Sequence, residues 1–492
     1  MNVMLLNRAK YKIRNYFDYF VIANSDLFDK EYYLTTYSNF VSKNPITHFI
    51  LEGCNAGLKP NPEFNPEGYL YKNPDVARSG MNPLVHYIRS GKSEGRTWYS
   101  DFQSGHTPGS AFSSKHHGLA YIERHIENLK SIYSGGIKPA PRWLEKKVLI
   151  VTDLGLPQCV KYRVLQKIEA FFHADIPALY LRSNDVVGIV NSMFECTTVI
   201  FFRLVHSKEL VQYIELAKLL GVKAIYDIDD PLFDVDAYTK NRNLDTLSKS
   251  EKKGILGNIG LYQKAILSFD QLFVSTPGMQ VLASENGAKE TIVWRNALDS
   301  ETKAAARYAL RNKCNRENEI RIFYGSGSRA HDLDFEVVKN VLANLLSEHK
   351  NLCLVVVGYA ILGRKLSRFG KRVIQLPYLG IEDYLKEIAD SDIVIIPLLL
   401  DRFNSAKSAV RFIESSAVNV PVVASKTADF INLIVDGENG FLAENAEEWL
   451  AKLTRLIQSQ QLRSETGKNA SIFVAENLNI NHVAKEVLPF IK

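Results

Sequence analysis

Two cations and one carboxylate stand at helical spacing late in the chain. On a helix, Lys407, Arg411 and Glu414 would be related as i, i+4 and i+7 and would share one face. The cations suit a diphosphate, and an ionised carboxylate can accept two hydrogen bonds from a sugar diol. The predicted strand 420–425 follows directly, so the helix N-terminus would face the sheet edge where open α/β folds bind ligands. A surface ion pair between Arg411 and Glu414 is the alternative interpretation.

A glycine-rich turn precedes this stretch. Residues 324–331 read Tyr-Gly-Ser-Gly-Ser-Arg-Ala-His and join a predicted strand to a predicted helix. The glycines let the backbone approach a ligand, and free N–H groups at a helix N-terminus favour a phosphate there. Arg329 would add a positive charge. A tight turn without a ligand is the alternative, because Ala330 stands where a dinucleotide fingerprint has its last glycine.

Three carboxylates, Asp227, Asp229 and Asp230, follow another predicted strand. One interpretation is a divalent cation shared with a nucleotide diphosphate. A second is that Asp229 or Asp230 orients an acceptor hydroxyl, and a third is that these residues cap a helix or form a turn. We favour the second, because Lys407 and Arg329 could neutralise a diphosphate in place of a metal.

The segment 158–163 follows the first strand of the alternating region and opens a helix. Arg163 is placed to reach a phosphate or an acidic acceptor across a cleft, and Arg203, at the end of another strand, could do the same. A structural or surface arginine is the alternative for each. Cys159 is not a candidate nucleophile, since no histidine has a sequence relation that supports a Cys–His pair.

The elements that must position these residues alternate in type from residue 146 onward. The first series has strand candidates at 147–152, 178–181, 198–202, 223–227, 271–275 and 291–294. The second has them at 320–324, 353–358, 373–376, 393–397 and 420–425, and a helix is expected over 405–416. Such alternation predicts α/β architecture with two Rossmann-like, doubly wound parallel sheets. A final helix around 480–491 would cross back to the first of them.

The first hundred residues have a different pattern. Residues 26–99 hold an internal repeat in which an Asn-Pro pair separates two predicted helices in each copy. His48 and His86 occupy equivalent positions, where packing or capping competes with metal binding. Residues 1–25 are basic and aromatic, and would form either an amphipathic helix on an anionic membrane surface or a helix packed on the protein.

Composition narrows the class of protein. The chain has 492 residues, of which 46% are hydrophobic and 23% charged, so wholesale disorder is excluded. A net charge of +6 is too small for a dedicated nucleic-acid binder. The five cysteines include no CxxC pair, which argues against a disulfide scaffold or a structural zinc site and favours a reducing cytoplasm. The longest apolar runs are too short to span a membrane.

Several of these stretches together resemble the family-4 retaining glycosyltransferases of the GT-B fold. Residues 407–425, followed by 434–442 (Ile-Val-Asp-Gly-Glu-Asn-Gly-Phe-Leu), are similar to the donor-domain signature of that family. Weaker likenesses link 294–299 to the family's first-domain ending, and 226–233 and 325–331 to a bacterial rhamnosyltransferase-like branch. The repeat at 26–99 resembles modules beside bacterial polysaccharide glycosyltransferases. The sequence departs at Ala406, where many members carry the first of two glutamates.

The resemblance implies transfer of a sugar, with retention, from a nucleotide-diphosphate donor to a glycan or lipid-linked oligosaccharide acceptor in bacterial surface polysaccharide synthesis. Neither a metal nor a cofactor is expected. The candidate catalytic residues are Asp229, Asp230 and Arg163. The candidate donor-binding residues are Gly325, Ser326, Gly327, Ser328, Arg329, Asn404, Lys407, Ser408, Arg411 and Glu414. A non-catalytic glycan-binding or scaffold protein on a degenerate transferase fold is the alternative, motivated by Ala406.

The expected organisation has six parts: a basic segment 1–25, a helical repeat module 26–99, a linker 100–145, an acceptor-side domain 146–300, a donor-binding domain 315–480 and a C-terminal helix 481–492. Nucleic acid is not expected as a partner. The expected location is cytoplasmic, with peripheral contact at the inner face of the membrane through residues 1–25.

Overall fold

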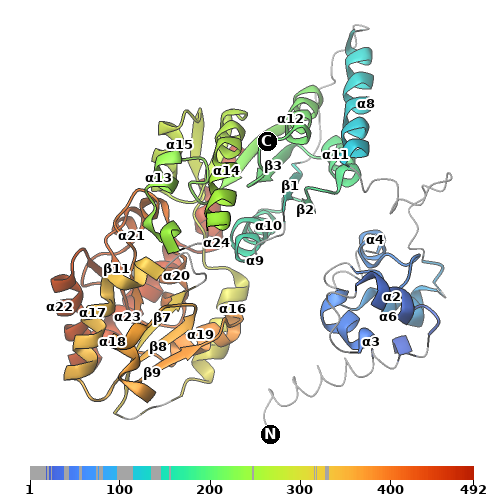
Figure 1. Ribbon diagram of the computed structural model, residues 1–492. Coiled ribbons are helices and arrows are strands. Elements are labelled where there is room, and N and C mark those ends of the chain that lie inside the picture. Colours follow the sequence, from blue (N-terminus) through green and yellow to red (C-terminus); the bar gives the residue numbers. More distant parts are fainter. Residues whose placement is uncertain are drawn as a thin grey trace. The chain divides into compact units, whose positions relative to one another are not determined.

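The computed structural model describes residues 18, 21–23, 25–37, 44–54, 58–73, 76, 81–92, 94–96, 115–134, 146–153, 157–246, 249–314, 316, 318–326 and 332–491. The chain forms two compact units, Met1–Ser113 and Ser114–Lys492. The described part of the first unit is helical, and the second carries two β-sheets with helices around them (Figure 1). Most of the basic segment 1–25 lies outside the described residues.

The first unit contains the same arrangement twice. The first copy has α2 (Lys30–Thr36), α3 (Pro45–His48) and η1 (Phe49–Gly53), and the second has α4 (Pro66–Lys72), α6 (Pro83–His86) and η2 (Tyr87–Gly91). Asn44 and Asn82 cap α3 and α6 by accepting from the backbone N–H groups two and three residues later. Proline then occupies the first helical position, where no N–H is needed.

The two equivalent histidines make equivalent contacts. The Tyr33 hydroxyl lies 3.0 Å from His48 Nδ1, and the Tyr69 hydroxyl lies 2.9 Å from His86 Nδ1. A Cβ atom added at the glycine that ends each copy would lie 2.0–2.1 Å from the corresponding tyrosine oxygen, so glycine makes room for the pair. Both histidines therefore pack inside the module. Nowhere among the described residues do three or more His, Cys, Asp or Glu side chains gather as a metal site.

The first sheet of the second unit has six parallel strands in the order β2-β1-β3-β4-β5-β6. Its strands are β1 (Val148–Thr152), β2 (Ala178–Arg182), β3 (Thr198–Phe202), β4 (Lys223–Ile228), β5 (Gln271–Val274) and β6 (Glu290–Val293). The central strands β1, β3 and β5 are buried along their whole length. Continuous burial explains their unbroken apolar sequences, which helices on both faces of a parallel sheet require.

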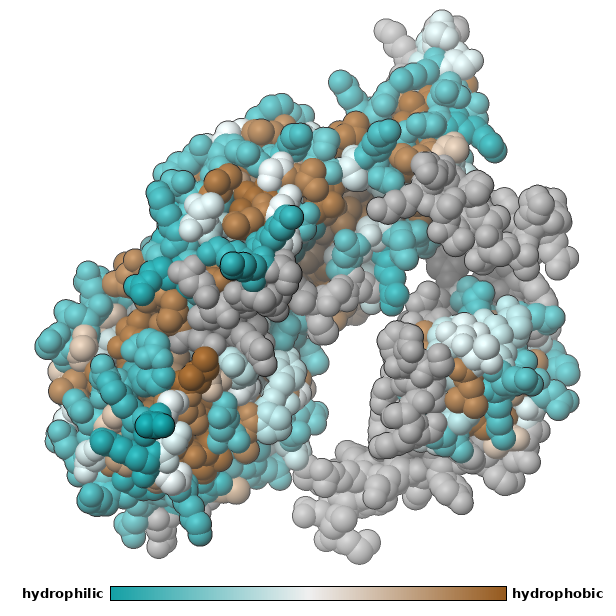
Figure 2. Space-filling model, in the orientation of Figure 1, coloured by the Kyte–Doolittle hydropathy of each residue, from teal (hydrophilic) through white to brown (hydrophobic). Residues whose placement is uncertain are grey.

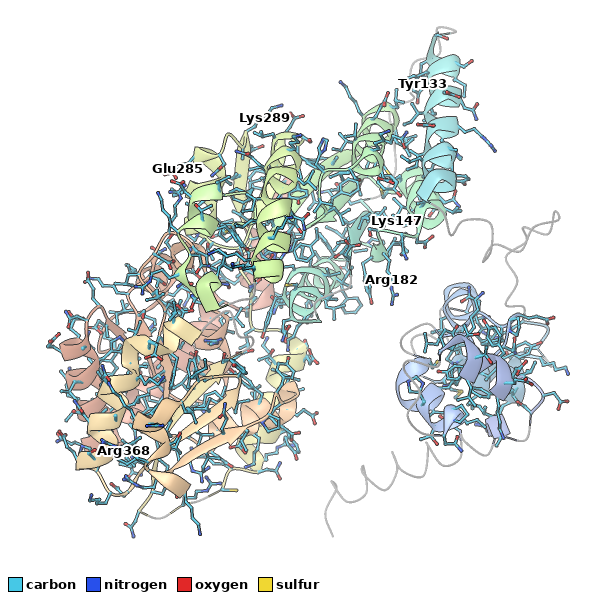
Figure 3. All side chains as sticks on the ribbon, in the orientation of Figure 1. Tyr133, Lys147, Arg182, Glu285, Lys289 and Arg368 are labelled. Carbon is cyan, nitrogen blue, oxygen red and sulfur yellow. The ribbon has the colours of Figure 1, made fainter. Side chains whose placement is uncertain are left out.

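Helices cover both faces of this sheet. They are α8 (Lys115–Ser134), α9 (Pro157–Cys159), η3 (Val160–Leu165), α10 (Gln166–His173), α11 (Val186–Glu195), α12 (Lys208–Leu220), α13 (Val235–Thr239), η4 (Arg242–Thr246), α14 (Lys249–Leu267) and α15 (Pro277–Glu285). Helix α8 lies in the segment expected to be a linker with a helical stretch near 119–133, and it packs against α11 and α12. Tyr133 near its end (Figure 3) donates to the Leu219 carbonyl at 3.2 Å.

The second sheet also has six parallel strands, in the order β12-β11-β10-β7-β8-β9. Its strands are β7 (Ile320–Ser326), β8 (Leu352–Gly358), β9 (Val373–Leu376), β10 (Ile393–Ile396), β11 (Val422–Ser425) and β12 (Phe441–Ala443). Its helices are α17 (Asp332–Glu348), α18 (Gly363–Ser367), η6 (Gly370–Arg372), α19 (Ile381–Ala389), η7 (Asn404–Ala406), α20 (Val410–Ala417), α21 (Ala428–Leu433), α22 (Ala446–Gln458) and α23 (Gln460–Asn477).

Two helices and the C-terminal segment join the sheets. Helix α16 (Ser300–Arg311) follows the first sheet and packs on α19 of the second. Helix α24 (Ile480–Lys485) and the turn η8 (Leu488–Phe490) return to the first sheet, where α24 packs against α10. Lys223 Nζ there donates to the Phe490 carbonyl at 2.6 Å. One apolar cluster runs through residues of both sheets, so the two halves share part of a core.

The predicted elements differ from the observed ones in several places. The final helix expected around 480–491 is α24 followed by the turn η8, and β12 was not predicted. The helix expected over 405–416 begins only at Val410, and Lys407 is extended with φ −65° and ψ 140°. Tertiary contacts decide this: Asp429 accepts from the Ala409 N–H at 3.0 Å, and the Ala406 carbonyl accepts from the Thr276 hydroxyl at 2.9 Å. Strand β7 runs two residues beyond Tyr324 because it stays paired with β8 up to Gly358.

Candidate functional site

A cavity of about 490 Å³ lies at the carboxyl ends of the strands of both sheets. In an open parallel sheet the strand order reverses at one point, between β1 and β3 in the first sheet and between β7 and β10 in the second. Ligands bind at such points. The lining residues are Gln158, Lys161, Tyr162, Asp230, Gly325, Ser326, Val357, Tyr378, Leu379, Ile381, Tyr384, Ile396, Leu398, Lys407, Ser408, Val410, Arg411, Glu414 and Phe430.

Lys407, Arg411 and Glu414 all line the cavity, although they do not share one helix face. Arg411 and Glu414 belong to α20, one turn apart, and Lys407 reaches the cavity from the extended residues before that helix. The sequence predicted the right three residues and the wrong local structure for Lys407. Two cations thus lie at the N-terminal end of α20, and a carboxylate lies one turn farther along the helix.

Glu414 is bound across the cavity by a residue of the first sheet's domain. The Tyr162 hydroxyl, from η3, donates a short hydrogen bond to Glu414 Oε1. Burial raises the pKa of the Glu414 carboxyl, and the hydrogen bond from Tyr162 opposes that rise. Burial and the nearby carboxylate raise the pKa of Tyr162 well above its ordinary value, so this phenol remains a donor.

Lys407 is paired with the acidic residues after β4. Its Nζ lies 3.1 Å from Asp230 Oδ1, and the other oxygen of that carboxylate accepts from Arg203 at 3.1 Å. Arg203, at the end of β3, also lies 3.4 Å from Asp229 Oδ1. Its backbone is in the left-handed region (φ 57°), which is uncommon for a residue with a side chain. Asp230 is therefore held between two cations, one from each half of the molecule.

Asp229 and Asp230 have different environments. Asp230 lines the cavity, whereas Asp229 is not among the lining residues. Burial raises the pKa of Asp229, Arg203 opposes the rise, and the neighbouring Asp230 adds to it. Burial and the charge of Asp229 also raise the pKa of the Cys159 thiol to about 12, so the thiolate that a nucleophile needs is disfavoured. Of the two aspartates, Asp230 is the one able to meet a ligand.

The glycine-rich turn is described only as far as Ser326. Gly325 and Ser326 end β7 and line the cavity. A Cβ atom at Gly325 would lie 2.5 Å from the Tyr384 hydroxyl oxygen, so this position needs glycine for space. The predicted donor-binding residues Gly327, Ser328 and Arg329 lie outside the described residues.

Arg163 is placed differently from its prediction. Its side chain is 1% exposed and is directed into the first domain. Both Nε and Nη2 donate to Asp227 Oδ1, at 3.0 and 2.7 Å, and Nη1 donates to the Trp294 carbonyl at 2.5 Å. Lys167 Nζ holds the other Asp227 oxygen at 2.5 Å. Arg163 therefore cannot reach a phosphate across the cleft, because Asp227 and the residues after β6 bind its guanidinium beneath the cavity wall.

The last two predicted donor-binding residues are placed differently from each other. Asn404 is fully buried, donates to Asp334 Oδ1 at 2.9 Å and to the Leu399 carbonyl at 3.0 Å, and does not line the cavity. Its observed contacts hold the loop that leads to Lys407. Ser408 does line the cavity, and its hydroxyl accepts from Asn296 Nδ2 at 3.0 Å.

Sequence reasoning missed the three tyrosines of the cavity. Tyr162 binds Glu414, Tyr378 accepts from Gln158 Nε2 at 2.7 Å, and Tyr384 packs on Gly325. Two of these contacts join residues more than 200 positions apart, so no local sequence pattern predicts them. The available signal was position, because Tyr162 lies in the segment that follows β1 and Tyr378 lies just after β9, at the edge where ligands bind.

Comparison with known protein families matches one segment in the second sheet's domain. Residues 322–459 match the family model described as Glycosyl transferases group 1, and this stretch holds most of the second sheet. No curated protein matches the chain in sequence. The two parallel sheets and the cavity between them form an α/β fold of the GT-B type.

Three solved structures illustrate what this chain is similar to. Anabaena Alr3699/HepE in complex with UDP and glucose is 15% identical, covering 70% of this chain and 99% of that chain, with a TM-score of 0.48. A glycosyltransferase from Rickettsia africae ESF-5 is 15% identical over 71% of this chain and 98% of that chain, with a TM-score of 0.49. Sucrose-phosphate synthase from Thermosynechococcus elongatus is 13% identical over 70% and 98%, with a TM-score of 0.47.

Proposed function

We propose that the protein transfers a sugar from a nucleotide-diphosphate donor to a glycan or lipid-linked acceptor, with the second domain holding the donor. One observation carries this proposal: Lys407, Arg411 and Glu414 converge on a single cavity, within the segment that matches the glycosyl transferases group 1 model. Lys407 and Arg411 supply the positive charge that a diphosphate needs. Glu414 supplies an acceptor for the hydroxyl groups of a ribose.

The chemistry follows from where charge develops. When the bond between the anomeric carbon and the diphosphate oxygen breaks, negative charge grows on the leaving diphosphate. Lys407 and Arg411 both line the cavity and would stabilise that charge electrostatically. Asp230, on the opposite wall, would accept a hydrogen bond from the acceptor hydroxyl and orient it toward the anomeric carbon. The acceptor oxygen then forms the new glycosidic bond as the bond to the diphosphate breaks, and the hydroxyl proton passes to an oxygen of the leaving diphosphate. Transfer with retention of the anomeric configuration is part of the proposal.

Calorimetry with UDP, GDP and dTDP tests the donor site. We expect one nucleotide to bind with and without EDTA, and Lys407→Ala and Glu414→Ala to weaken it at least about tenfold each. Lys426→Ala and Glu444→Ala are matched controls, because these exposed residues of the same domain form an ion pair with each other at 3.5 Å and are not among the residues that line the cavity. Binding of none of the three nucleotides would overturn the proposal in favour of a non-catalytic scaffold. Binding abolished by EDTA would contradict metal independence.

We further propose a role in bacterial surface glycan synthesis, with peripheral contact at the inner face of the membrane through residues 1–25. The basic and aromatic composition of that segment supports it. None of the described helices has the length and hydrophobicity that a membrane crossing requires. Hydrophilic residues are spread over the faces of both units seen in Figure 2. We expect deletion of 1–25 to reduce sedimentation with anionic vesicles, and equal sedimentation would contradict membrane contact.

A further inference from the structure

The two groups assigned to the donor are already engaged by the opposite wall of the cavity. Lys407 is held by Asp230, and Glu414 is held by Tyr162. Both partners come from the first sheet's domain, from the residues after β4 and from η3 respectively. Each pair joins residues that are more than 170 positions apart, and all four residues line the same cavity.

The chemistry of these partners matches the chemistry of the donor. A carboxylate oxygen on Lys407 is an anionic acceptor, as a diphosphate oxygen would be. A phenolic hydroxyl that donates to Glu414 takes the place of a ribose hydroxyl that would donate to the same oxygen. Two groups of the protein thus occupy, at once, the two contacts that a nucleoside diphosphate would make.

We propose that Asp230 and Tyr162 compete with the donor for its own binding groups, and that a nucleoside diphosphate enters the cavity by exchanging with both. The inference rests on the proposed function. In the exchange, Lys407 passes from the Asp230 carboxylate to the diphosphate, and Glu414 passes from the Tyr162 hydroxyl to the ribose. No covalent bond changes.

The exchange also prepares the acceptor side of the cavity. When Lys407 leaves, Asp230 Oδ1 turns from an ion-pair partner into an acceptor facing the bound donor. Arg203 keeps the other oxygen in place, since its guanidinium bonds to Oδ2 and also approaches Asp229. The guanidinium of Arg203 thus contacts both aspartates at once. Arg203 is in this sense a positioning residue, and the donor should bind before the acceptor.

Competition and direct contact with the donor predict opposite changes in nucleotide affinity when Asp230 or Tyr162 is substituted. If Asp230 or Tyr162 bound the donor directly, removing its polar group would weaken nucleotide binding. If they compete, removing the group should tighten binding, because the competent state becomes more populated. We expect Asp230→Asn and Tyr162→Phe each to tighten binding about threefold to tenfold, and the double variant to tighten it by roughly the product of the two factors.

Titration calorimetry with UDP, GDP and dTDP at pH 8 measures this, with the full chain and the two single variants and the double variant. The matched controls are Asp236→Asn and Tyr180→Phe, two exposed residues of the same domain outside the cavity, for which unchanged affinity is expected. Thermal unfolding of each variant establishes that it is folded, and either single variant suffices to test the exchange.

The outcomes separate the inference from the function on which it rests. Tighter binding by the folded variants, with unchanged controls, supports the exchange. Equal or weaker binding by the folded variants, while the unaltered protein binds a nucleotide, overturns the exchange and leaves the donor site standing. Failure of the unaltered protein and of the variants to bind any of the three nucleotides overturns both.

Discussion

The carboxyl edges of both sheets face the same cavity, but the residues at these two edges differ in kind. Each has six parallel strands and one reversal of strand order at which the cavity opens. Behind the edge of the first sheet is a buried ion cluster, in which Asp227 binds both Arg163 and Lys167. The edge of the second sheet ends in small residues, Gly325 and Ser326, which leave the backbone open to the cavity.

The difference shows how one topology can serve two tasks. In the first sheet, buried charges lock η3 and α10 to β4 and to the residues after β6, and this fixes the wall that carries Tyr162 and Asp230. In the second sheet, Gly325 makes room for the Tyr384 hydroxyl and Ser326 lines the cavity. Lys407 and Arg411 lie at the N-terminal end of α20, and Glu414 lies one turn farther along it. The following predictions test that contrast, from the largest expected effect to the smallest.

Removal of the central anion of the first edge should have the largest effect. Asp227→Ala leaves the Arg163 guanidinium and the Lys167 ammonium buried without their counter-ion, so we expect a loss of about 3–5 kcal/mol in the free energy of unfolding. Urea denaturation measures it. Asp236→Ala is the matched control, since Asp236 forms an exposed pair with Lys240 and should change stability by less than about 0.5 kcal/mol. If Asp227→Ala and Asp236→Ala lost similar amounts of stability, the buried ion cluster would not be what stabilises the edge of the first sheet.

The stability of the protein should depend on pH through Asp429, which lies at the edge of the second sheet. The substitution Asp429→Asn should remove this dependence. Burial raises the pKa of Asp429 from its ordinary value to about 6, with Arg295 opposing the rise. The folded state therefore holds this proton more tightly than the unfolded chain, and stability falls as pH rises from about 4 to about 6. Relative to Asp429→Asn, we expect the unaltered protein to lose about 2–3 kcal/mol over that range. Denaturation curves of both proteins at pH 4, 5, 6 and 7 measure it, and a constant difference would refute the assignment.

Filling the space at the end of β7 should have a moderate effect. Gly325→Ala brings a methyl group against the Tyr384 ring, so we expect a loss of about 1–3 kcal/mol and weaker nucleotide binding. Gly380→Ala is the control, because a Cβ atom there meets nothing within 4 Å. Thermal unfolding and calorimetry compare the two. If Gly325→Ala and Gly380→Ala have equal effects on stability and binding, the space beside Tyr384 is not the reason for glycine at position 325.

The exposed hydrogen bond between Gln158 and Tyr378, which joins the two sheet domains, should contribute least to stability. Tyr378→Phe removes the hydrogen bond from Gln158 at an exposed site, so we expect a change of less than about 1 kcal/mol in stability. Thermal unfolding measures it. A larger loss of stability would mean that the structure of both sheet edges depends on the hydrogen bond between Gln158 and Tyr378.

Much of the fold was predictable from local pattern. Strands such as β1 and β3 and helices such as α12 and α22 follow from apolar runs and helical periodicity, which physical chemistry dictates within short windows. The start of α20 was not predictable, because contacts with Asp429 and Thr276 set it. The placement of Arg163 was also beyond the sequence, since a cation after a strand can be directed into the cavity or into the core.

The sequence by itself determined the two alternating halves, the repeat in the first hundred residues, and the set of charged residues that includes Lys407, Asp230 and Glu414. Side-chain type, apolar periodicity and strand–helix alternation are local properties, so they can be derived from the residues alone. Only the tertiary structure decided which of these charges face each other. Pairs such as Tyr162 with Glu414 depend on how two separate sheets close over one cavity, and that geometry is set by packing between residues far apart in the chain.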